Sequence, residues 1–245
     1  MLFFKKKRID LKELFPKGFV DIHSHLLPGI DDGAKDINQS IDLIKKMRSY
    51  GIKNFITTPH VLGDVYPNSS ILIKEKLNVV QEALEKQQIK DITIRAAAEY
   101  MMDEQFVSLL EKKDILTLKD NYVLVEMSYF SAPFNLFEIL FELQLKGYKP
   151  VLAHPERYNF YHNDLDHFYK LKKAGCLFQL NLLSLTKQYG TQVQKTSSKL
   201  LQENLYDFVG TDTHHSMHLE LLQEIGTEKI QQSIAHLLEN NKMFL

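Results

Sequence analysis

Cysteine is almost absent from this sequence, which contains Cys176 as its one thiol. A lone cysteine excludes an intramolecular disulfide framework and a zinc site built from thiolates. It also fits a reducing compartment, so the cytoplasm is the expected location. Cys176 lies within an apolar segment, and we interpret it as a core residue.

The chain also lacks an excess of either charge and any long hydrophobic run. With 30 basic and 31 acidic side chains its net charge is −1, which gives no general attraction toward nucleic acid. No apolar stretch approaches the roughly 20 residues of a transmembrane helix, so stable membrane insertion is not expected. Basic residues 5–8 follow a short apolar start, the reverse of the order in a signal peptide. We interpret residues 1–17 as an N-terminal extension, and a weak contact of its cations with anionic lipid or a partner protein stays open.

What the sequence does contain is an alternation of short apolar runs with amphipathic segments. Strands are predicted at residues 19–23, 52–57, 92–97, 122–126, 150–153, 176–180 and 207–211. Helices are predicted at residues 38–50, 69–88, 103–112, 133–147, 164–174, 192–204 and 228–240. In the helix that begins near Pro133, we expect Phe137, Leu140 and Phe141 to be buried.

Seven βα units favour one α/β domain, residues 18–245, built as a closed or nearly closed parallel barrel. An open doubly wound sheet is the alternative. Its nucleotide-binding version has no support, because neither a glycine-rich dinucleotide motif nor a P-loop follows any predicted strand.

Residue types that bind metals stand at the C-terminal ends of these strands. In chain order they are His23, His25, Asp31, Asp32, His60, Glu99, Glu126, His154, Asp212 and His214. Only the sixth strand, which runs into Asn181, offers no such group. Because strand side chains alternate between faces, the two members of each His-x-His or Asp-x-His pair project to the same side. All strand ends of a parallel barrel meet at one mouth, where such folds carry their chemistry.

Each group alone has an ordinary structural explanation. A single His-x-His is weak evidence, Asp31-Asp32-Gly33 is typical of a turn, and Glu126 fits a buried, hydrogen-bonded carboxylate. Six of the seven strand ends carry such a group, however, and burying that much charge without cations is prohibitively unfavourable. The combined pattern predicts a site for several divalent ions, with Zn²⁺, Mn²⁺ or Fe as suitable occupants.

A phosphohydrolase is the predicted class of enzyme. Two ions about 3.5–4 Å apart generate a hydroxide nucleophile at neutral pH and stabilise the oxygens of phosphoryl transfer. Arg157, three residues after His154, is placed to grip phosphate, although a salt bridge to Glu156 or Asp164 explains its position equally well. Cysteine-dependent phosphatase chemistry is excluded because Leu182 stands where the required arginine should be. A serine triad lacks its Gly-x-Ser-x-Gly motif.

Four segments resemble the bacterial protein-tyrosine phosphatases of the PHP (polymerase and histidinol phosphatase) superfamily. These segments are residues 23–34, 57–60, 154–158 and 210–214. The family's enzymes are manganese-dependent and are linked to capsule and exopolysaccharide synthesis. The resemblance implies a distorted seven-stranded (β/α)7 TIM-like PHP barrel that holds three divalent metal ions, Mn²⁺ first, with Fe, Zn²⁺ or Mg²⁺ as alternatives. The implied substrate is phosphotyrosine on a bacterial tyrosine kinase that controls polysaccharide export.

Carried over residue by residue, the resemblance implies three sets of metal ligands. The first ion takes His23, His25, Glu99 and Asp212. The second shares Glu99 and adds Glu126 and His154. The third takes Asp32, His60 and His214. Asp212 and His214 are also expected to act in catalysis.

Phosphate binding is where the sequence departs from the family. Arg157 matches the family's phosphate-binding arginine, but some members carry a second arginine shortly after the last motif. Residues 215–220 contain none, and Leu219 stands near its place. Substrate binding then rests on Arg157, with His215 or His218 as substitutes.

Three other functions compete with this prediction. A small-molecule phosphomonoesterase of the same superfamily, such as a histidinol phosphatase, would use the same metals. An amidohydrolase-type hydrolase would also begin with His-x-His, but it requires a modified bridging lysine and eight strands. A metal-stabilised docking subunit without activity should lack a ligand, and here every implied ligand position is filled.

Overall fold

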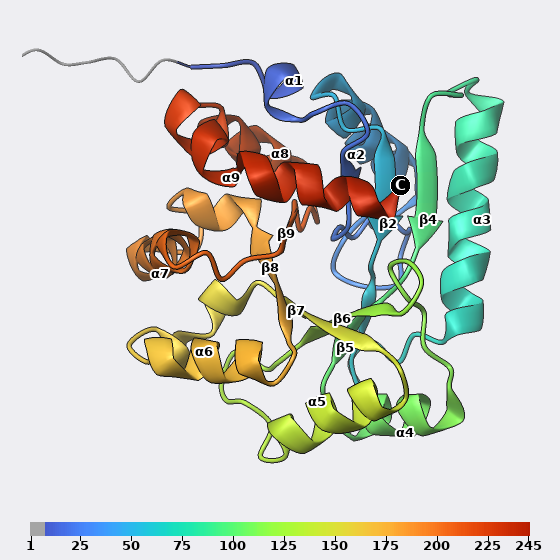
Figure 1. Ribbon diagram of the computed structural model, residues 1–245. Coiled ribbons are helices and arrows are strands. Elements are labelled where there is room, and N and C mark those ends of the chain that lie inside the picture. Colours follow the sequence, from blue (N-terminus) through green and yellow to red (C-terminus); the bar gives the residue numbers. More distant parts are fainter. Residues whose placement is uncertain (1–7) are drawn as a thin grey trace, which may run out of the picture.

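The computed structural model describes residues 8–245, so residues 1–7, with most of the basic start, lie outside the described residues. Strands and helices alternate along the described chain (Figure 1). The strands are β1 (Val20–Asp21), β2 (Asn54–Thr57), β3 (His60–Val61), β4 (Thr93–Ala96), β5 (Glu99–Met101), β6 (Tyr122–Glu126), β7 (Lys149–Ala153), β8 (Leu177–Asn181) and β9 (Phe208–Gly210). Each predicted strand is present, with ends that differ by at most two residues.

These strands form two parallel sheets, where the sequence analysis expected one sheet of seven strands. A three-stranded sheet has the order β1-β2-β4, and a curled six-stranded sheet has the order β3-β5-β6-β7-β8-β9. The second predicted strand continues past Thr57 but is interrupted before β3, because Pro59 has no N–H to donate to a neighbouring strand. The third predicted strand is also divided, at Ala97 and Ala98 between β4 and β5, where the sequence has no proline.

Backbone hydrogen bonds connect the first strand segment with the last. The N–H of His25 donates to the carbonyl of Thr213 at 2.9 Å, and the N–H of Asp212 donates to the carbonyl of His23 at 2.8 Å. Residues that follow β1 therefore lie directly beside residues that follow β9. This contact brings both ends of the chain's strand series to one mouth.

Helices pack around the strands (Figure 1). They are α1 (Leu11–Leu14), α2 (Ile37–Ser49), α3 (Ser70–Lys86), α4 (Glu104–Lys112), α5 (Leu136–Leu145), α6 (Leu165–Lys173), α7 (Thr191–Gln202), α8 (Ser216–Leu222) and α9 (Glu228–Asn240). The seven predicted helices are all present within three residues at each end, whereas α1 and α8 were not predicted. Ser69 caps α3 by accepting from the N–H of Leu72 at 3.2 Å.

The predicted burial of α5 is partly wrong. Leu140 is buried, but 44% of Phe137 and 63% of Phe141 are exposed. The buried face carries Leu136, Ile139 and Leu143 instead. Apolar residues occupy most of the circumference of this helix, so their spacing does not single out the face that meets the sheet.

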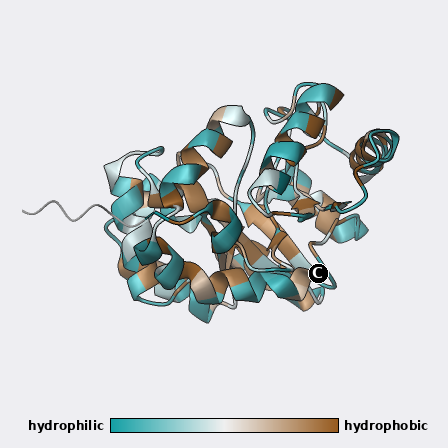
Figure 2. Cartoon of the chain, turned by 90° about the horizontal axis from the view of Figure 1, so that it is seen from above, coloured by the Kyte–Doolittle hydropathy of each residue, from teal (hydrophilic) through white to brown (hydrophobic). Residues whose placement is uncertain are grey.

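The core lies between the strands and the inner faces of the helices, where hydrophobic residues gather in Figure 2. Cys176 is buried in this core as predicted, and burial raises the pKa of its thiol to about 12. A thiol with such a pKa is inert at neutral pH. Within residues 8–245, none of the helices has both the length and the apolar character needed to cross a membrane.

Candidate metal centre

The strand ends bring the predicted metal-binding side chains into one buried cluster. His60 begins β3 and pairs in register with Glu99, the first residue of β5. Glu126 ends β6, His154 follows β7, and Asp212 follows β9. His23 and His25 reach the same place after β1, because their backbone is hydrogen-bonded to the segment that follows β9.

Four groups of ligand atoms lie close enough together to hold ions, with all atoms of a group within 4.8 Å of one another. The groups are His25, Asp32, His60 and His214; His23, His154 and Asp212; His23, His25 and Glu99; and His60, Glu99 and Glu126. Asp212 also approaches the third group, since its Oδ1 lies 3.3 Å from His23 Nε2 and 3.4 Å from His25 Nε2.

These groups differ from the implied ligand sets at three histidines, of which His25 also joins the group of Asp32, His60 and His214. His60 Nδ1 lies 2.9 Å from Glu126 Oε1, so His60 joins the glutamates expected to bind with His154. His154 groups instead with His23 and Asp212, although its Nε2 remains 2.9 Å from Glu99 Oε1. His60 faces Asp32 through its other nitrogen, Nε2, at 3.5 Å. When a histidine faces two groups of ligand atoms, the sequence alone does not determine which ion it binds.

The spacing of the ligand atoms fits bound metal. Ligands 2.0–2.2 Å from a tetrahedral ion lie about 3.4 Å from one another. His23 Nε2 and His25 Nε2 are 3.4 Å apart, and they lie 3.2 and 3.5 Å from Glu99 Oε2. Glu99 Oε2 is fully buried and has no hydrogen-bond partner among the described residues. A buried carboxylate oxygen surrounded by imidazole nitrogens at these distances is well explained as a metal ligand.

Electrostatics give the same indication. Burial acts to raise the pKa of Asp212. The charges of His23 and His214 act in the opposite direction and help to bring the pKa well below its usual range. Burial lowers the pKa of His25, yet Asp31 and hydrogen bonds to Asp212 and Glu99 raise it well above its usual range. The cluster thus requires positive charge, which protons or divalent cations can supply.

Residues outside the nine implied metal ligands hold the histidines in place. With Nδ1 protonated, His23 donates to Gln179 Oε1 at 2.8 Å and His25 donates to Asp31 Oδ2 at 2.8 Å, so each Nε2 faces the cluster. Asn181 Nδ2 donates to Asp212 Oδ2 at 2.7 Å. Strand β8, which offers no ligand, therefore contributes Gln179 and Asn181 as supports. Their alternate spacing in an apolar strand was the available signal, because it places both on one face.

Arg157 lies at the edge of the cluster. Its Nη1 donates to Asp212 Oδ2 at 2.8 Å, rather than pairing with Glu156 or Asp164. Its guanidinium lies between two aromatic rings, 4.1 Å from the centre of Tyr189 and 4.8 Å from that of Tyr129. Stacking of this kind restricts the guanidinium to one plane while its remaining N–H groups stay available.

Comparison with known proteins identifies the family. Residues 19–236 match the family described as capsular polysaccharide synthesis, CpsB/CapC. This chain is a member of the CpsB/CapC family. It is 31% identical over 238 residues to the tyrosine-protein phosphatase YwqE of Bacillus subtilis, covering 92% of this chain and 93% of YwqE. It is 27% identical over 202 residues to the tyrosine-protein phosphatase CpsB of Streptococcus agalactiae, covering 80% and 83% of the two chains.

Solved structures agree with this assignment. One crystal structure superposes on this chain with a TM-score of 0.76. It comes from work on YwqE from Bacillus subtilis and CpsB from Streptococcus pneumoniae, which are metal-dependent tyrosine phosphatases. The superposition covers 90% of this CpsB/CapC chain and 94% of the solved one, at 31% identity.

In this CpsB/CapC protein, His215 and His218 lie near the position of the family's second arginine, but they differ from an exposed, charged arginine. Leu219 is buried, and His218 is buried beside the carbonyl of Asp212. Burial, together with His215 and His214, lowers the pKa of His218 to about 4, so His218 is neutral at physiological pH. The ring of His215 lies 3.9 Å from that of His218, and its pKa is also lowered, first by burial.

Proposed function

We propose that this CpsB/CapC chain is a metal-dependent protein-tyrosine phosphatase. The observation that carries the proposal is the meeting of histidines and carboxylates, at the spacing of metal ligands, beside a stacked arginine. The phosphotyrosine activity in the names of YwqE and CpsB supports the substrate class. A bacterial tyrosine kinase that regulates capsule or exopolysaccharide synthesis is the proposed partner, and the cytoplasm the proposed location.

We further propose three divalent ions, Mn²⁺ first, held by the nine predicted ligands. These are His23, His25, Asp32, His60, Glu99, Glu126, His154, Asp212 and His214. Bound ions supply a hydroxide nucleophile at neutral pH and charge stabilisation for phosphoryl transfer. Residues 18–245 are proposed as one metallophosphatase domain. Counting β2 with β3 and β4 with β5 as single interrupted strands makes its barrel seven-stranded.

The chain's own residues divide the remaining work. Arg157 binds the phosphate through the N–H groups that Asp212 leaves available, and the rings of Tyr129 and Tyr189 keep its plane fixed. Asp212 fixes Arg157 relative to His23 and His25, so the phosphate is positioned against the metal cluster. His214 is partly exposed at the mouth, where its Nε2 lies 3.5 Å from Asp32 Oδ1. A phosphate ester therefore approaches from the side of Asp32, His214 and Arg157.

Turnover of matched phosphate esters tests the function. We expect phosphotyrosine peptides to be hydrolysed in the presence of Mn²⁺ with kcat/KM at least about 100-fold above those of phosphoserine peptides and histidinol phosphate. Equal or greater turnover of histidinol phosphate would assign the site to small-molecule substrates instead. If none of these three substrates is hydrolysed with any divalent metal, the proposed enzymatic function is rejected.

Substituting Arg157 tests the phosphate-binding role. We expect Arg157→Ala to lower kcat/KM by about 10²-fold, chiefly through KM, because a bidentate contact to phosphate is lost. Arg157→Lys keeps the charge but not the planar fork, so it should recover only part of the loss. Metal content measured by elemental analysis should match that of the unmodified protein. An unchanged kcat/KM in Arg157→Ala means that Arg157 does not contact the phosphate.

A further inference from the structure

Large apolar side chains are exposed along the segment that leads from β6 into α5. Phe130 is 95% exposed, Phe134 is fully exposed, and Phe137 and Phe141 follow in the first two turns of α5. Leu145 continues the series, because residues 137, 141 and 145 share one side of the helix at four-residue spacing. Phe137, Phe141 and Leu145 line one surface hollow together, and exposed apolar surface of this kind is typical of an interaction site.

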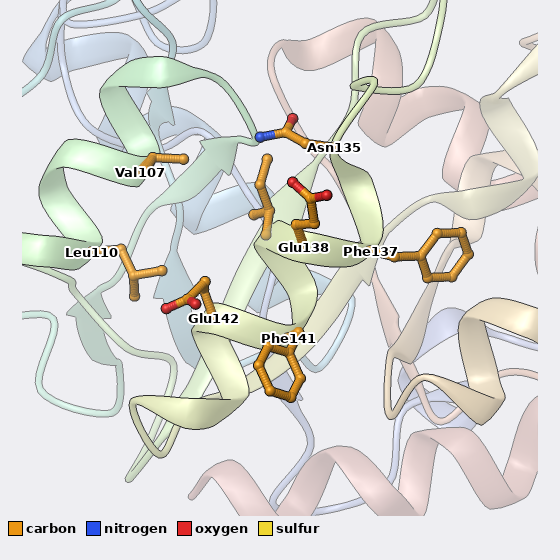
Figure 3. Close-up of a pocket in the computed structure, with 8 residues that line it drawn as sticks. Val107, Leu110, Asn135, Phe137, Glu138, Phe141 and Glu142 are labelled. Atoms are coloured by element: carbon orange, nitrogen blue, oxygen red, sulfur yellow. The ribbon is translucent and has the colours of Figure 1, made fainter.

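A groove of about 520 Å³ lies beside this surface, between α4 and α5. Figure 3 shows Val107 and Leu110 projecting from α4 toward α5, and Glu138 and Glu142 projecting from α5 along the same groove. Phe141 lines the groove too. The groove thus combines apolar walls with two carboxylates.

The charge of the groove indicates what kind of chain fits it. Glu138 and Glu142 stand four residues apart on one helix, a spacing at which like charges repel. Neither has an ion-pair partner among residues 8–245, and both are exposed. A cationic side chain placed between them relieves this repulsion, while its neighbours contact the apolar walls. An anionic lipid surface, by contrast, is repelled.

The groove is within reach of the catalytic mouth. Tyr129, whose ring contacts the Arg157 guanidinium, is six residues before Asn135, which lines the groove and is drawn at its top in Figure 3. Six residues span at most about 22 Å, so the groove begins within that distance of Tyr129. From Asn135 to Glu142 the helix rises about 10 Å further. An extended peptide of about five to ten residues therefore connects the mouth with the groove.

We propose that this groove docks the polypeptide of a protein substrate, in a segment with apolar and basic side chains about five to ten residues from the phosphotyrosine. The inference rests on the proposed function and adds a requirement for the sequence around the modified tyrosine. Phe130 and Phe134 are exposed and lie between Tyr129 and Asn135 in the sequence, so the proposal expects them to contact the intervening peptide.

Synthetic peptides with one phosphotyrosine test the proposal. Two of the peptides carry leucine and lysine five to ten residues from the phosphotyrosine, one on its C-terminal side and the other on its N-terminal side. Two matched peptides carry serine at the same positions. With the Mn²⁺-loaded protein, we expect kcat/KM to be about tenfold higher for at least one of the two leucine–lysine peptides than for its serine-containing match. The gain should appear in KM rather than in kcat, because docking remote from the mouth does not change the chemical step.

Two variants assign the gain to the groove. The double charge reversal Glu138→Lys with Glu142→Lys, and separately Phe141→Ser, should reduce the preference to less than about twofold. Both should leave turnover of p-nitrophenyl phosphate unchanged. The matched control is Glu75→Lys with Glu82→Lys on α3, which makes the same charge change on exposed residues of another helix and should keep the preference.

Three results overturn the proposal. The first is equal kcat/KM for leucine–lysine and serine peptides with the unmodified protein. The second is a preference that survives in both groove variants. The third is a concentration-dependent dimer in sedimentation that Phe141→Ser abolishes, which assigns the groove to a second copy. Failure of the proposed function looks different, because then either none of the phosphotyrosine peptides is hydrolysed, or histidinol phosphate is hydrolysed at least as fast as they are.

Discussion

Replacing Asp212 with alanine is expected to lower phosphatase turnover by at least about 10³-fold and to reduce bound metal. Asp212 Oδ1 lies 3.3 and 3.4 Å from the ligand nitrogens of His23 and His25, while Oδ2 accepts from Arg157 and Asn181. One substitution therefore removes a proposed ligand and the anchor of the phosphate-binding arginine together. His25→Ala should lose turnover through metal loss alone.

The comparison of substitutions separates these two roles. Asp212→Asn keeps the shape and hydrogen bonding but removes the charge that a divalent ion requires, so it should also lose metal. Asp91→Ala is the control, because Asp91 is paired with Arg48 and Lys53 on the surface and should leave turnover and metal content unchanged. Circular dichroism checks that each variant is folded. A folded Asp212→Ala protein with full metal content and normal kcat contradicts the proposed site.

Much of this arrangement was accessible from sequence, because parallel βα units leave a regular signal. Continuous apolar runs followed by polar ligand types located the strands, and the fold rule for parallel strands placed their ends together. The cluster around Glu99 follows from that rule and needs no knowledge of loop conformation. The amphipathic segments likewise located the seven predicted helices to within three residues at each end.

Features that depend on side-chain direction were not accessible. The partition of His60 and His154 between ligand groups depends on which ring nitrogen faces which carboxylate, and spacing along the chain does not determine that. The outward direction of Phe137 and Phe141 depends on how α5 is rotated against the sheet. Pro59 is visible in the sequence, but the sequence does not show that the strands divide into two sheets there.

Two of the residues that follow strands also have an uncommon backbone conformation. His154 has φ of 35° and Asp212 has φ of 50°, both in the left-handed region. Such conformations cost on the order of 1–2 kcal/mol for residues with a Cβ atom. They turn the chain sharply after β7 and β9, where each side chain joins the cluster. Strained residues persist where surrounding contacts hold them, and functional sites are a common setting.

Removal of metal by chelation and dialysis is expected to abolish turnover completely, and Mn²⁺ should restore it. Cys176→Ser should behave like the unmodified protein in both steps, because the buried thiol takes no part. A variant of Cys176 that is folded, fully loaded with metal and inactive would indicate thiol chemistry. Activity that survives exhaustive chelation undiminished would reject metal dependence.

The pH dependence of reloading has a definite sign. The pKa values of His23, His25 and His60 are raised in the metal-free protein, in which burial opposes protonation but the carboxylates of Glu99, Asp212, Asp31 and Glu126 outweigh it. Raised pKa values favour the protonated imidazoles, and a divalent ion must displace the protons from the ligand nitrogens. Raising the pH removes the competing protons, so Mn²⁺ affinity measured by calorimetry should increase between about pH 6 and pH 8, by up to about tenfold per pH unit for each proton displaced. Affinity that stays constant over this range would mean that no imidazole proton is displaced by the metal between pH 6 and pH 8, which contradicts the raised pKa values.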